Sequence, residues 1–361
     1  MNNKITALIP THKRPHLLRR AILSVLNQSY ANLQVCVFDN ASADETQSMV
    51  DALITQDGRI RYHCHSKNIG SLLNFKFAFQ SVDTPYFSIL SDDDALAFDF
   101  YEHAATVLDE NPDIMFVILN TLTINEETNL IGDQENTHQL TFYRGDERLN
   151  IKNIPMTWTS MLFRKEVADI YTEMDSRFDI AADMRFLLHA RARYSFAYLS
   201  KVGAFFMDHT NSTSANRKRF DIVHHVTQIS RYIEIYHDNS IHPAIKENVI
   251  LSIKNRLKPT KKQLFCDFID TLKIATKTIL NNSNMDNEYY LEEITDAKKA
   301  GLHASAFFLT VLYQNKYIQK MIRLLLSRYY QKQILRHQAD MKKRQNTQYK
   351  SYFDQLNKIS A

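Results

Sequence analysis

Three adjacent carboxylates follow an apolar segment in "YFSILSDDDAL", residues 86–96. Like charges about 4 Å apart repel by roughly 4 kcal/mol at an intermediate effective dielectric, so Asp92, Asp93 and Asp94 need compensation from outside the triplet. A divalent cation would supply it, because Mg²⁺ and Mn²⁺ take oxygen ligands. The alternative is a solvated loop in which Asp92 or Asp93 caps the next helix. The triplet alone favours the loop, so the surrounding sequence must decide.

The segments around the triplet alternate between strand and helix patterns. Apolar runs predict strands at residues 5–10, 33–40, 60–66, 86–90 and 114–121, and helical spacing predicts helices at 15–30, 42–54, 72–82 and 99–112. This alternation predicts an α/β fold with a Rossmann-like, mostly parallel sheet and helices on both faces. Ligands bind beyond the carboxyl ends of such strands, so residues 11–14, 39–40 and 92–94 should meet at one edge.

The second half of the chain has a mainly helical pattern. We predict helices at 158–171 and 179–194, then a polar helical region that includes 242–257 and a long closing stretch from about residue 304. A chain of 361 residues exceeds the usual size of one domain. We therefore expect an α/β domain at residues 1–215 and a helical C-terminal region at residues 216–361.

Composition excludes several classes of protein. The chain has only six glycines and neither a dinucleotide-binding G-x-G-x-x-G nor a P-loop, and its three cysteines form no C-x-x-C pair, which fits a reducing compartment. No apolar run is long enough for a signal peptide or a transmembrane helix. We expect a cytoplasmic protein, with peripheral contact at the inner face of a membrane left open.

The positive charge is concentrated near the C-terminus. Residues 301–361 hold 11 Lys+Arg and 2 Asp+Glu, a balance of +9, which leaves 33 − 38 = −5 for residues 1–300. The basic character is therefore a property of the C-terminal tail and predicts no nucleic-acid partner for the α/β domain.

Seven segments, taken in order, resemble family 2 glycosyltransferases of the GT-A fold. They are "ALIPTHKRPHLLRRAILSVLNQSY", "VFDNASADET", "NIGSLLNFKFAF", "YFSILSDDDAL", "TSMLFRKEV", "AADMRFLLHA" and "MDHTNSTS". Seven ordered matches are more specific than any single motif. They cover roughly residues 4–215 and leave the C-terminal region outside the resemblance.

The resemblance implies a nucleotide-sugar donor, a divalent metal cofactor (Mn²⁺ or Mg²⁺) and transfer to an acceptor hydroxyl with inversion. It implies that Asp94 binds the metal, that His209 completes the metal shell and that Asp183 is the general base. Asp92 is expected on the ribose or base side of the donor. The full set of residues implied to contact the donor is Pro10, Thr11, Arg14, Asp39, Asn40, Asn68, Gly70, Asp92 and Asp93.

Several of these residues have a plainer interpretation. Thr11 and Arg14 also suit an ordinary helix entry, and the pair Asn68 and Gly70 also suits a strand-to-helix turn. Asn40 stands where many relatives have an acid, and it leaves the identity of the base open because an Asn side chain both donates and accepts. Taken alone, His209 would be a solvated loop histidine.

The base and the aromatic residues also have competing interpretations. Asp179 competes with Asp183 for the role of base, and a helix N-cap is an alternative for both. His63 and His65 point the same way on a strand, where surface or core positions are favoured over a metal pair. Trp158 could stack on an acceptor sugar or lie in the core.

The resemblance predicts a metal-dependent, inverting glycosyltransferase of bacterial-type surface polysaccharide or glycoconjugate synthesis. Its acceptor would be a saccharide, a lipid-linked saccharide or a protein. One rival is a catalytically silent nucleotide-sugar-binding or scaffold module on the same fold. Another is a sugar nucleotidyltransferase, but that chemistry usually has a glycine-rich loop after the first strand, and "IPTHKRPHLL" contains no glycine.

The tail segment 313–337 places Ile318 and Ile322 on one helical face and Lys316 and Lys320 on another. Packing on the catalytic domain or an oligomer contact would explain the apolar face. The functional interpretation adds that the basic face, with the basic run at 342–344 beyond it, lies against anionic lipid. It predicts salt-sensitive liposome binding that is lost on truncation after about residue 300, with donor binding retained.

Overall fold

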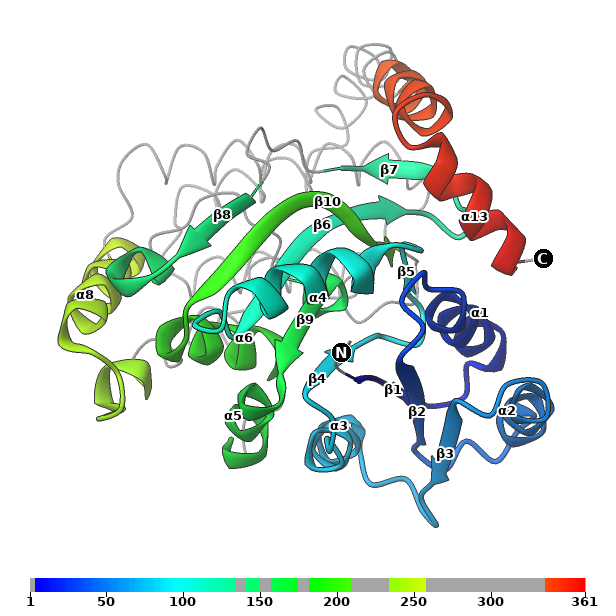
Figure 1. Ribbon diagram of the computed structural model, residues 1–361, viewed down its shortest axis with the longest axis horizontal. Coiled ribbons are helices and arrows are strands. Elements are labelled where there is room, and N and C mark those ends of the chain that lie inside the picture. The colour runs from blue at the N-terminus through cyan, green and yellow to red at the C-terminus, as the bar shows by residue number, and fades with distance from the viewer. Residues whose placement is uncertain are drawn as a thin grey trace, which may run out of the picture. The chain divides into compact units, whose positions relative to one another are not determined.

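The structure is a computed structural model that describes residues 4–133, 140–149, 157–174, 182–208, 234–257 and 335–360. Within these ranges, ten strands form one mixed sheet in the order β3-β2-β1-β4-β9-β6-β10-β5, with β7 paired to β6 and β8 to β10 (Figure 1). The strands are β1 (Ile5–Thr11), β2 (Leu33–Asp39), β3 (Ile60–Cys64), β4 (Tyr86–Ile89), β5 (Ala95–Leu96), β6 (Phe116–Ile124), β7 (Leu130–Gly132), β8 (Leu140–Tyr143), β9 (Met161–Arg164) and β10 (Phe196–Met207). The α-helices are α1 (Pro15–Leu26), α2 (Thr46–Ile54), α3 (Ser71–Gln80), α4 (Phe100–Glu110), α5 (Ala168–Glu173), α6 (Ala182–Arg193), α8 (Pro243–Leu257) and α13 (Lys350–Ser360).

The first half of the sheet is parallel, as the sequence predicts. Strand β1 pairs in parallel with β2 and β4, and β2 pairs in parallel with β3. Strand β9 then runs antiparallel between β4 and β6, while β6 and β10 are parallel. The carboxyl ends of β1, β2 and β4 therefore lie at the same edge of the sheet, which is where ligands bind in this class of fold.

Both faces of the sheet are covered, and the alternation of side chains along the strands explains how. Along β1, Ile5, Ala7 and Ile9 belong to the buried cluster that includes residues of α1, α2 and α4. Leu8, which points the opposite way, belongs to the cluster that includes residues of α3, α5 and α6. A strand that is buried on both sides reads as a continuous apolar run, which is why "ITALIP" predicts a strand without showing an alternating pattern.

The structure differs from the sequence prediction in the second half of the α/β region. The helix predicted at 158–171 is wrong: its middle is β9, which pairs with β4 and β6, and only the part from Ala168 is the α-helix α5. Strand β10 was not predicted at all. The helices predicted at 179–194 and 242–257 are confirmed in their described parts by α6 and α8.

The chain forms two compact units. The first unit contains residues 1–209, 239–248 and 341–361, so the C-terminal helix α13 belongs to the same unit as the sheet. The second contains residues 210–238 and 249–340. The boundary predicted between residues 215 and 216 stays a prediction, because residues 209–233 lie outside the described ranges. What the structure adds is that the last twenty residues return to the first unit.

The tail is only partly described. The two faces predicted on 313–337 lie almost wholly outside the described residues, which resume at Leu335. In the basic run 342–344, Lys342 and Lys343 are exposed, while Arg344 pairs with Asp133 at 3.0 Å between Nη1 and Oδ2. Among the described residues, no helix is both long enough and apolar enough to cross a bilayer.

Candidate active site

The acidic triplet lies in the short loop between β4 and β5. It does not cap the next helix, because α4 starts at Phe100 and its N-cap position is Asp99. The side chains of the triplet turn back into the protein, and Asp92 and Asp94 are both buried. The plain interpretation of a solvated, capping loop is therefore wrong, and each carboxylate needs a specific partner.

Asp92 and Asp93 are paired with the segment that follows β1. Thr11 Oγ1 donates to Asp92 Oδ2 at 2.7 Å. The guanidinium of Arg14 bridges both carboxylates, at 3.1 Å from Nη1 to Asp92 Oδ1 and 2.9 Å from Nη1 to Asp93 Oδ2. Burial raises the pKa of Asp92 to about 6, although Arg14 opposes this shift. Thr11 and Arg14 were both predicted to contact the donor. They hold the carboxylate of Asp92, which was itself expected to lie beside the donor.

Asp94 is held by two segments that are far from it in the sequence. Thr159 Oγ1 donates to Oδ2 at 2.6 Å, and the backbone N–H of Met207 donates to Oδ1 at 2.9 Å. The side chain is almost completely buried. Burial raises the pKa of the Asp94 carboxyl to about 8, and the charge of Asp93 adds to this shift. Each oxygen of Asp94 accepts one of these bonds and keeps a second lone pair.

A second arginine, Arg20, contacts the backbone of the triplet. Arg20 of α1 is buried, and its Nη2 donates to the backbone carbonyl of Asp93 and to the sulfur of Met207, 3.6 Å away. Burial lowers the pKa of Arg20, and the carboxylates of Asp94 and Asp93 oppose that shift. Because a guanidinium stays charged in proteins, Arg20 is a permanent counter-charge for the triplet.

The carboxyl end of β2 carries Asp39, which organises the neighbouring loops. The Ser42 hydroxyl donates to Asp39 Oδ1 at 2.5 Å and the Tyr62 hydroxyl donates to Oδ2 at 2.6 Å. Ser42 therefore does not cap α2, which begins at Thr46. The residues on either side of it, Ala41 and Ala43, have φ of 57° and 53°. Left-handed conformations of non-glycine residues cost energy and are concentrated at functional sites.

Asn40 links the end of β2 to the loop that precedes α3. Its Nδ2 donates to Asn68 Oδ1 at 3.0 Å, and its Oδ1 accepts from the backbone N–H of Ile69 at 2.8 Å. Asn68 Oδ1 also accepts from the N–H of Gly70 at 2.9 Å, where φ is 86°. An aspartate at position 40 could not donate to Asn68, so the amide found here has a structural explanation.

The predicted base is in the first turn of α6, and its competitor is not described. Asp183 is half-buried there, and the adjacent Ala182 shares a buried cluster with Trp158. Asp179 and His209 lie outside the described residues. His209 follows, by two positions in the sequence, Met207, whose N–H donates to Asp94.

Trp158 and the histidine pair are parts of aromatic clusters. Trp158 is 9% exposed, and its ring centroid lies 4.9 Å from that of Phe75, which establishes a core position. His63 stacks on the ring of Phe77 at 4.6 Å, and His65 lies 4.9 Å from the same ring. His65 also contacts Asn74 through Nε2. These contacts agree with the preference for surface or core histidines over a metal pair.

The residues of the triplet fit a divalent cation in donor type and in charge. Carboxylate oxygens are the ligands that Mg²⁺ and Mn²⁺ prefer. When all three carboxylates are ionised, they face the two guanidinium groups of Arg14 and Arg20, and 2 − 3 leaves one negative charge for a cation to neutralise. In the described part of the chain, no three His, Cys, Asp or Glu side chains could hold a metal on their own. A cation would need further ligands, and Mg²⁺ commonly takes them from substrate phosphates and water.

Sequence reasoning missed three residues that hold the triplet. Thr159, Arg20 and Met207 contact Asp94 or Asp93 from three different elements. Arg20 could have been noticed in the sequence, because it is a charged residue on the apolar face of α1, between Leu18 and Ala21. Thr159 and Met207 lie in two of the seven matched segments, "TSMLFRKEV" and "MDHTNSTS", but nothing in those segments indicated a contact with Asp94.

The fold is that of GT-A glycosyltransferases, as predicted. Residues 1–349 of TarS from S. aureus, in complex with UDP-GlcNAc, align with a TM-score of 0.58 at 14% identity, covering 86% of this chain and 91% of that chain. A mannosyltransferase from Pyrobaculum calidifontis, in complex with GDP-Man and Mn²⁺, aligns with a TM-score of 0.51 at 12% identity, covering 89% and 85%. At such identities the likeness concerns the fold alone.

The family likeness is visible in the sequence as well. Residues 6–171 match the profile of the family described as "Glycosyl transferase family 2", from β1 into α5, which confirms the predicted resemblance. An abequosyltransferase of Salmonella typhimurium is 35% identical over 113 residues, 30% of this chain and 34% of that protein. A GalNAc(5)-diNAcBac-PP-undecaprenol beta-1,3-glucosyltransferase of Campylobacter jejuni is 33% identical over 94 residues, 26% and 30%. The match thus spans about a third of each of these relatives.

Proposed function

We propose that this chain transfers a sugar from a nucleoside-diphosphate donor to an acceptor hydroxyl, with inversion and with the help of Mn²⁺ or Mg²⁺. The observation that carries the proposal is the meeting of three strand ends at one edge of the sheet: Thr11 and Arg14 after β1, Asp39 and Asn40 after β2, and the buried triplet after β4. Buried carboxylates with raised pKa are concentrated at functional sites.

The donor half of the site would be formed by the residues after β1, β2 and β4. Asp94 would hold the cation, which when bound neutralises charge on the departing nucleoside diphosphate. Arg14 is 36% exposed in its side chain and bridges Asp92 and Asp93, so its guanidinium reaches solvent at the place proposed for the donor. Asn40 and Asn68 would fix the loop that lies over the donor. Donor contacts are also proposed for Pro10 and Gly70.

The chemical step proposed for this site is a single displacement. The acceptor oxygen attacks the anomeric carbon, the bond from that carbon to the phosphate oxygen breaks, and the nucleoside diphosphate leaves with the electron pair. Asp183 takes the proton of the acceptor hydroxyl, and His209 is proposed to join the cation's ligands. General-base catalysis of this kind contributes about 10²- to 10⁴-fold.

The acceptor class is proposed from the relatives. One of them carries undecaprenyl diphosphate in the name of its acceptor, and both are named as transferases of single sugars. We favour a lipid-linked saccharide in surface polysaccharide or glycoconjugate synthesis. Work on such an acceptor would place the enzyme at the inner face of a membrane, and the basic segments of the tail support contact with anionic lipid.

The test is a transfer assay with the purified full chain, nucleotide-sugars and a bacterial lipid extract as acceptor. We expect a product larger by one sugar in mass spectrometry, loss of that product with a chelator, and recovery on adding Mn²⁺. Nuclear magnetic resonance of the linkage should show the anomeric configuration opposite to that of the donor. Donor binding without any transfer or hydrolysis, across all acceptors, would favour the catalytically silent module instead.

A further inference from the structure

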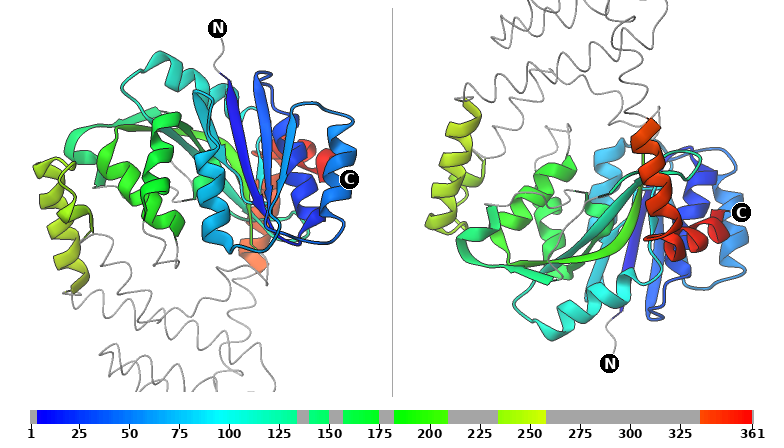
Figure 2. Two further views of the ribbon diagram at one scale, coloured as in Figure 1. Left: turned by 90° about the horizontal axis from the view of Figure 1, so that it is seen from below. Right: turned by 90° about the horizontal axis from the view of Figure 1, so that it is seen from above.

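The C-terminal segment packs against the part of the sheet that carries Asp94. Met341, Tyr349, Phe353 and Leu356 are buried in one cluster with residues of β5, β6, β7 and β10. Figure 2 shows α13 beside α1 from two further directions, and the two helices are in contact. The segment belongs to the same compact unit as the sheet. The chain therefore returns, after more than 130 residues in between, to the strands of the candidate site.

One aromatic contact of α13 connects it to the strands that flank Asp94. The ring of Phe353 meets the ring of Phe205 edge to face, with centroids 5.3 Å apart. Phe205 lies in β10 opposite Ala95 of β5, the residue that follows Asp94. Two positions further along β10, the N–H of Met207 donates to Asp94 Oδ1. Phe353 thus packs on the pair of strands whose ends fix the carboxylate.

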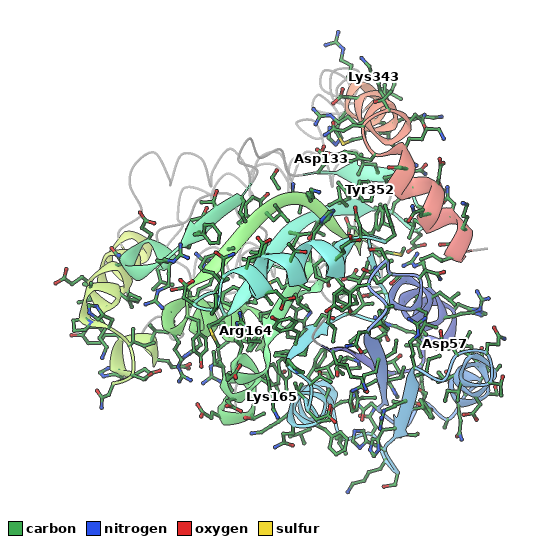
Figure 3. The ribbon with its side chains drawn as sticks, viewed as in Figure 1. Asp57, Asp133, Arg164, Lys165, Lys343 and Tyr352 are labelled. Carbon is green, nitrogen blue, oxygen red and sulfur yellow. The ribbon has the colours of Figure 1, made fainter. Side chains whose placement is uncertain are left out.

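Polar contacts also hold the C-terminal segment in place against the sheet. Asp133 accepts from Arg344 Nη1 at 3.0 Å and from the Tyr349 hydroxyl at 2.9 Å, and Figure 3 labels Asp133 and Tyr352 in this region. The Tyr352 hydroxyl lies 3.4 Å from Asp99 Oδ2. The side chain of Gln345 accepts from the N–H of Leu130 at 3.0 Å. These bonds hold the residues just before α13 and its first turn in one defined position against the sheet.

Two of the elements that hold the triplet are in contact with this segment. Arg20 comes from α1, which touches α13, and Met207 ends β10, which contributes to the cluster around Phe353. Strand β5, which follows Asp94, contributes to the same cluster. Leu17 of α1 packs against that same cluster. We propose that α13 is a positioning element for the Asp94 carboxylate. Without it, β10 and β5 lose the apolar support that keeps the Met207 N–H aimed at Asp94.

The expected effect on cation binding rests on the proposed function. If Asp94 holds the cation, the cation should bind more weakly when the position of the Asp94 carboxylate is less well fixed. The inference also revises the expectation that truncation after residue 300 leaves donor binding intact, because that truncation removes α13. The side chain to remove is that of Phe353, which is buried and entirely apolar. Phe353→Ala should loosen the strand ends, and Phe353→Leu should restore most of the support.

Two readouts in the full chain separate the inference from the proposed function. The first is hydrogen exchange at the Met207 amide, which we expect to be at least tenfold faster in Phe353→Ala and intermediate in Phe353→Leu. The second is titration with Mn²⁺ alone, followed by the electron paramagnetic resonance of the free ion, in which Phe353→Ala should bind about tenfold more weakly. Circular dichroism confirms that each variant is folded.

Two controls match the variant. Asp354→Ala removes the neighbouring side chain, which is exposed on the same helix and pairs only at the surface with Lys350. Leu53→Ala removes a buried side chain of α2 that belongs to a different cluster. Both controls should leave the Met207 exchange rate and Mn²⁺ binding within about twofold of the parent.

The outcomes are distinguishable. Unchanged exchange at Met207 in folded Phe353→Ala overturns the inference, and so does an equal change in Leu53→Ala. If Met207 exchange accelerates as expected while the parent chain shows no Mn²⁺ binding that depends on Asp94, the positioning role of α13 stands and the proposed metal site is wrong. Parent-like Mn²⁺ affinity in Phe353→Ala, with the parent binding Mn²⁺, would overturn the positioning role.

Discussion

Asp92 and Asp94 are two residues apart, yet the protein holds them by opposite means. Asp92 is held on the β1 side by a neighbouring hydroxyl and by Arg14, whose side chain is partly open to solvent. Asp94 is held on the β10 side by Thr159 and the N–H of Met207, and no cationic group among the described residues donates a hydrogen bond to it directly. Burial raises the pKa of Asp94 to about 8 and that of Asp92 to about 6, and the closer cation explains the smaller shift.

The comparison indicates that Asp92 and Asp94 have different roles at this edge of the sheet. A carboxylate compensated by a partly exposed arginine can exchange that partner for a ligand at little cost. A buried carboxylate that accepts hydrogen bonds from neutral donors, with its nearest described cation not bonded to it, has a less fully compensated charge, and a bound cation would stabilise it most. We therefore expect variants of Asp94 and of its partners on the β10 side to weaken cation binding strongly. Variants of the partners of Asp92 on the β1 side should weaken it only slightly.

The largest effect is expected from Asp94→Asn. The amide removes the buried charge, and its NH₂ group cannot accept the hydrogen bond made to the oxygen that it replaces. We expect Mn²⁺-dependent donor binding to fall by at least 100-fold in calorimetric titration. Asp57→Asn, at a surface pair with Arg59, is the control and should bind as the parent does. Equal affinity in Asp94→Asn and parent would remove Asp94 from the site.

Asp183→Asn should lower turnover by about 10²- to 10⁴-fold, the usual contribution of a general base, with donor affinity nearly unchanged. Steady-state transfer rates and donor titration measure the two effects separately. Asp179→Asn is the matched comparison, because it is the competing acid four positions earlier. A larger loss of turnover in Asp179→Asn would transfer the role of base to that residue.

Thr159→Val removes the hydroxyl that donates to Asp94 Oδ2 and keeps the shape of the side chain. A hydrogen bond to a charged group contributes about 1.5–3 kcal/mol, so Mn²⁺ affinity should fall by roughly ten- to a hundredfold. Thr159→Ser retains the hydroxyl and should restore most of the affinity. If Val and Ser variants bind equally well, the hydroxyl has no part in holding the carboxylate.

The smallest effect on the cation is expected from Arg14→Gln. Its ion pairs are partly exposed, and such pairs contribute only about 0–1 kcal/mol to the free energy of unfolding. We expect a small decrease in melting temperature and Mn²⁺ binding within a few-fold of the parent. Nucleotide affinity should decrease more than Mn²⁺ affinity. A loss of Mn²⁺ binding as large as that of Thr159→Val would contradict the division between the two sides.

The β1 side could be predicted from the sequence because its elements are local. Strand β1, α1 and β2 follow each other with short connections, and their apolar periodicity and the proline at the start of α1 are visible in the chain itself. Arg14 belongs to this stretch, and the triplet follows β4, a strand that the sequence also predicts. The sequence did not show that Arg14 pairs with the triplet or that Arg20 contacts it. The position of an arginine on an apolar helix face does not indicate which residue it pairs with.

The β10 side could not be predicted, because its structure depends on contacts between distant segments. Strand β9 is apolar enough for helix or strand, and its pairing with β4 and β6 decides the outcome. The close approach at Gly203, where a Cβ would lie 2.5 Å from that of Leu119, is visible only in three dimensions. The contact of Phe353 with Phe205 joins residues almost 150 positions apart.

The most direct test of the account is calorimetric titration of the parent chain with UDP, GDP, CDP and dTDP, each with and without Mn²⁺. The account predicts that at least one nucleoside diphosphate binds, that Mn²⁺ tightens its binding by tenfold or more, and that Asp94→Asn abolishes the effect of Mn²⁺. Binding of none of the four under either condition, by a chain shown to be folded, would contradict the central claim that this edge of the sheet is a nucleotide-sugar site.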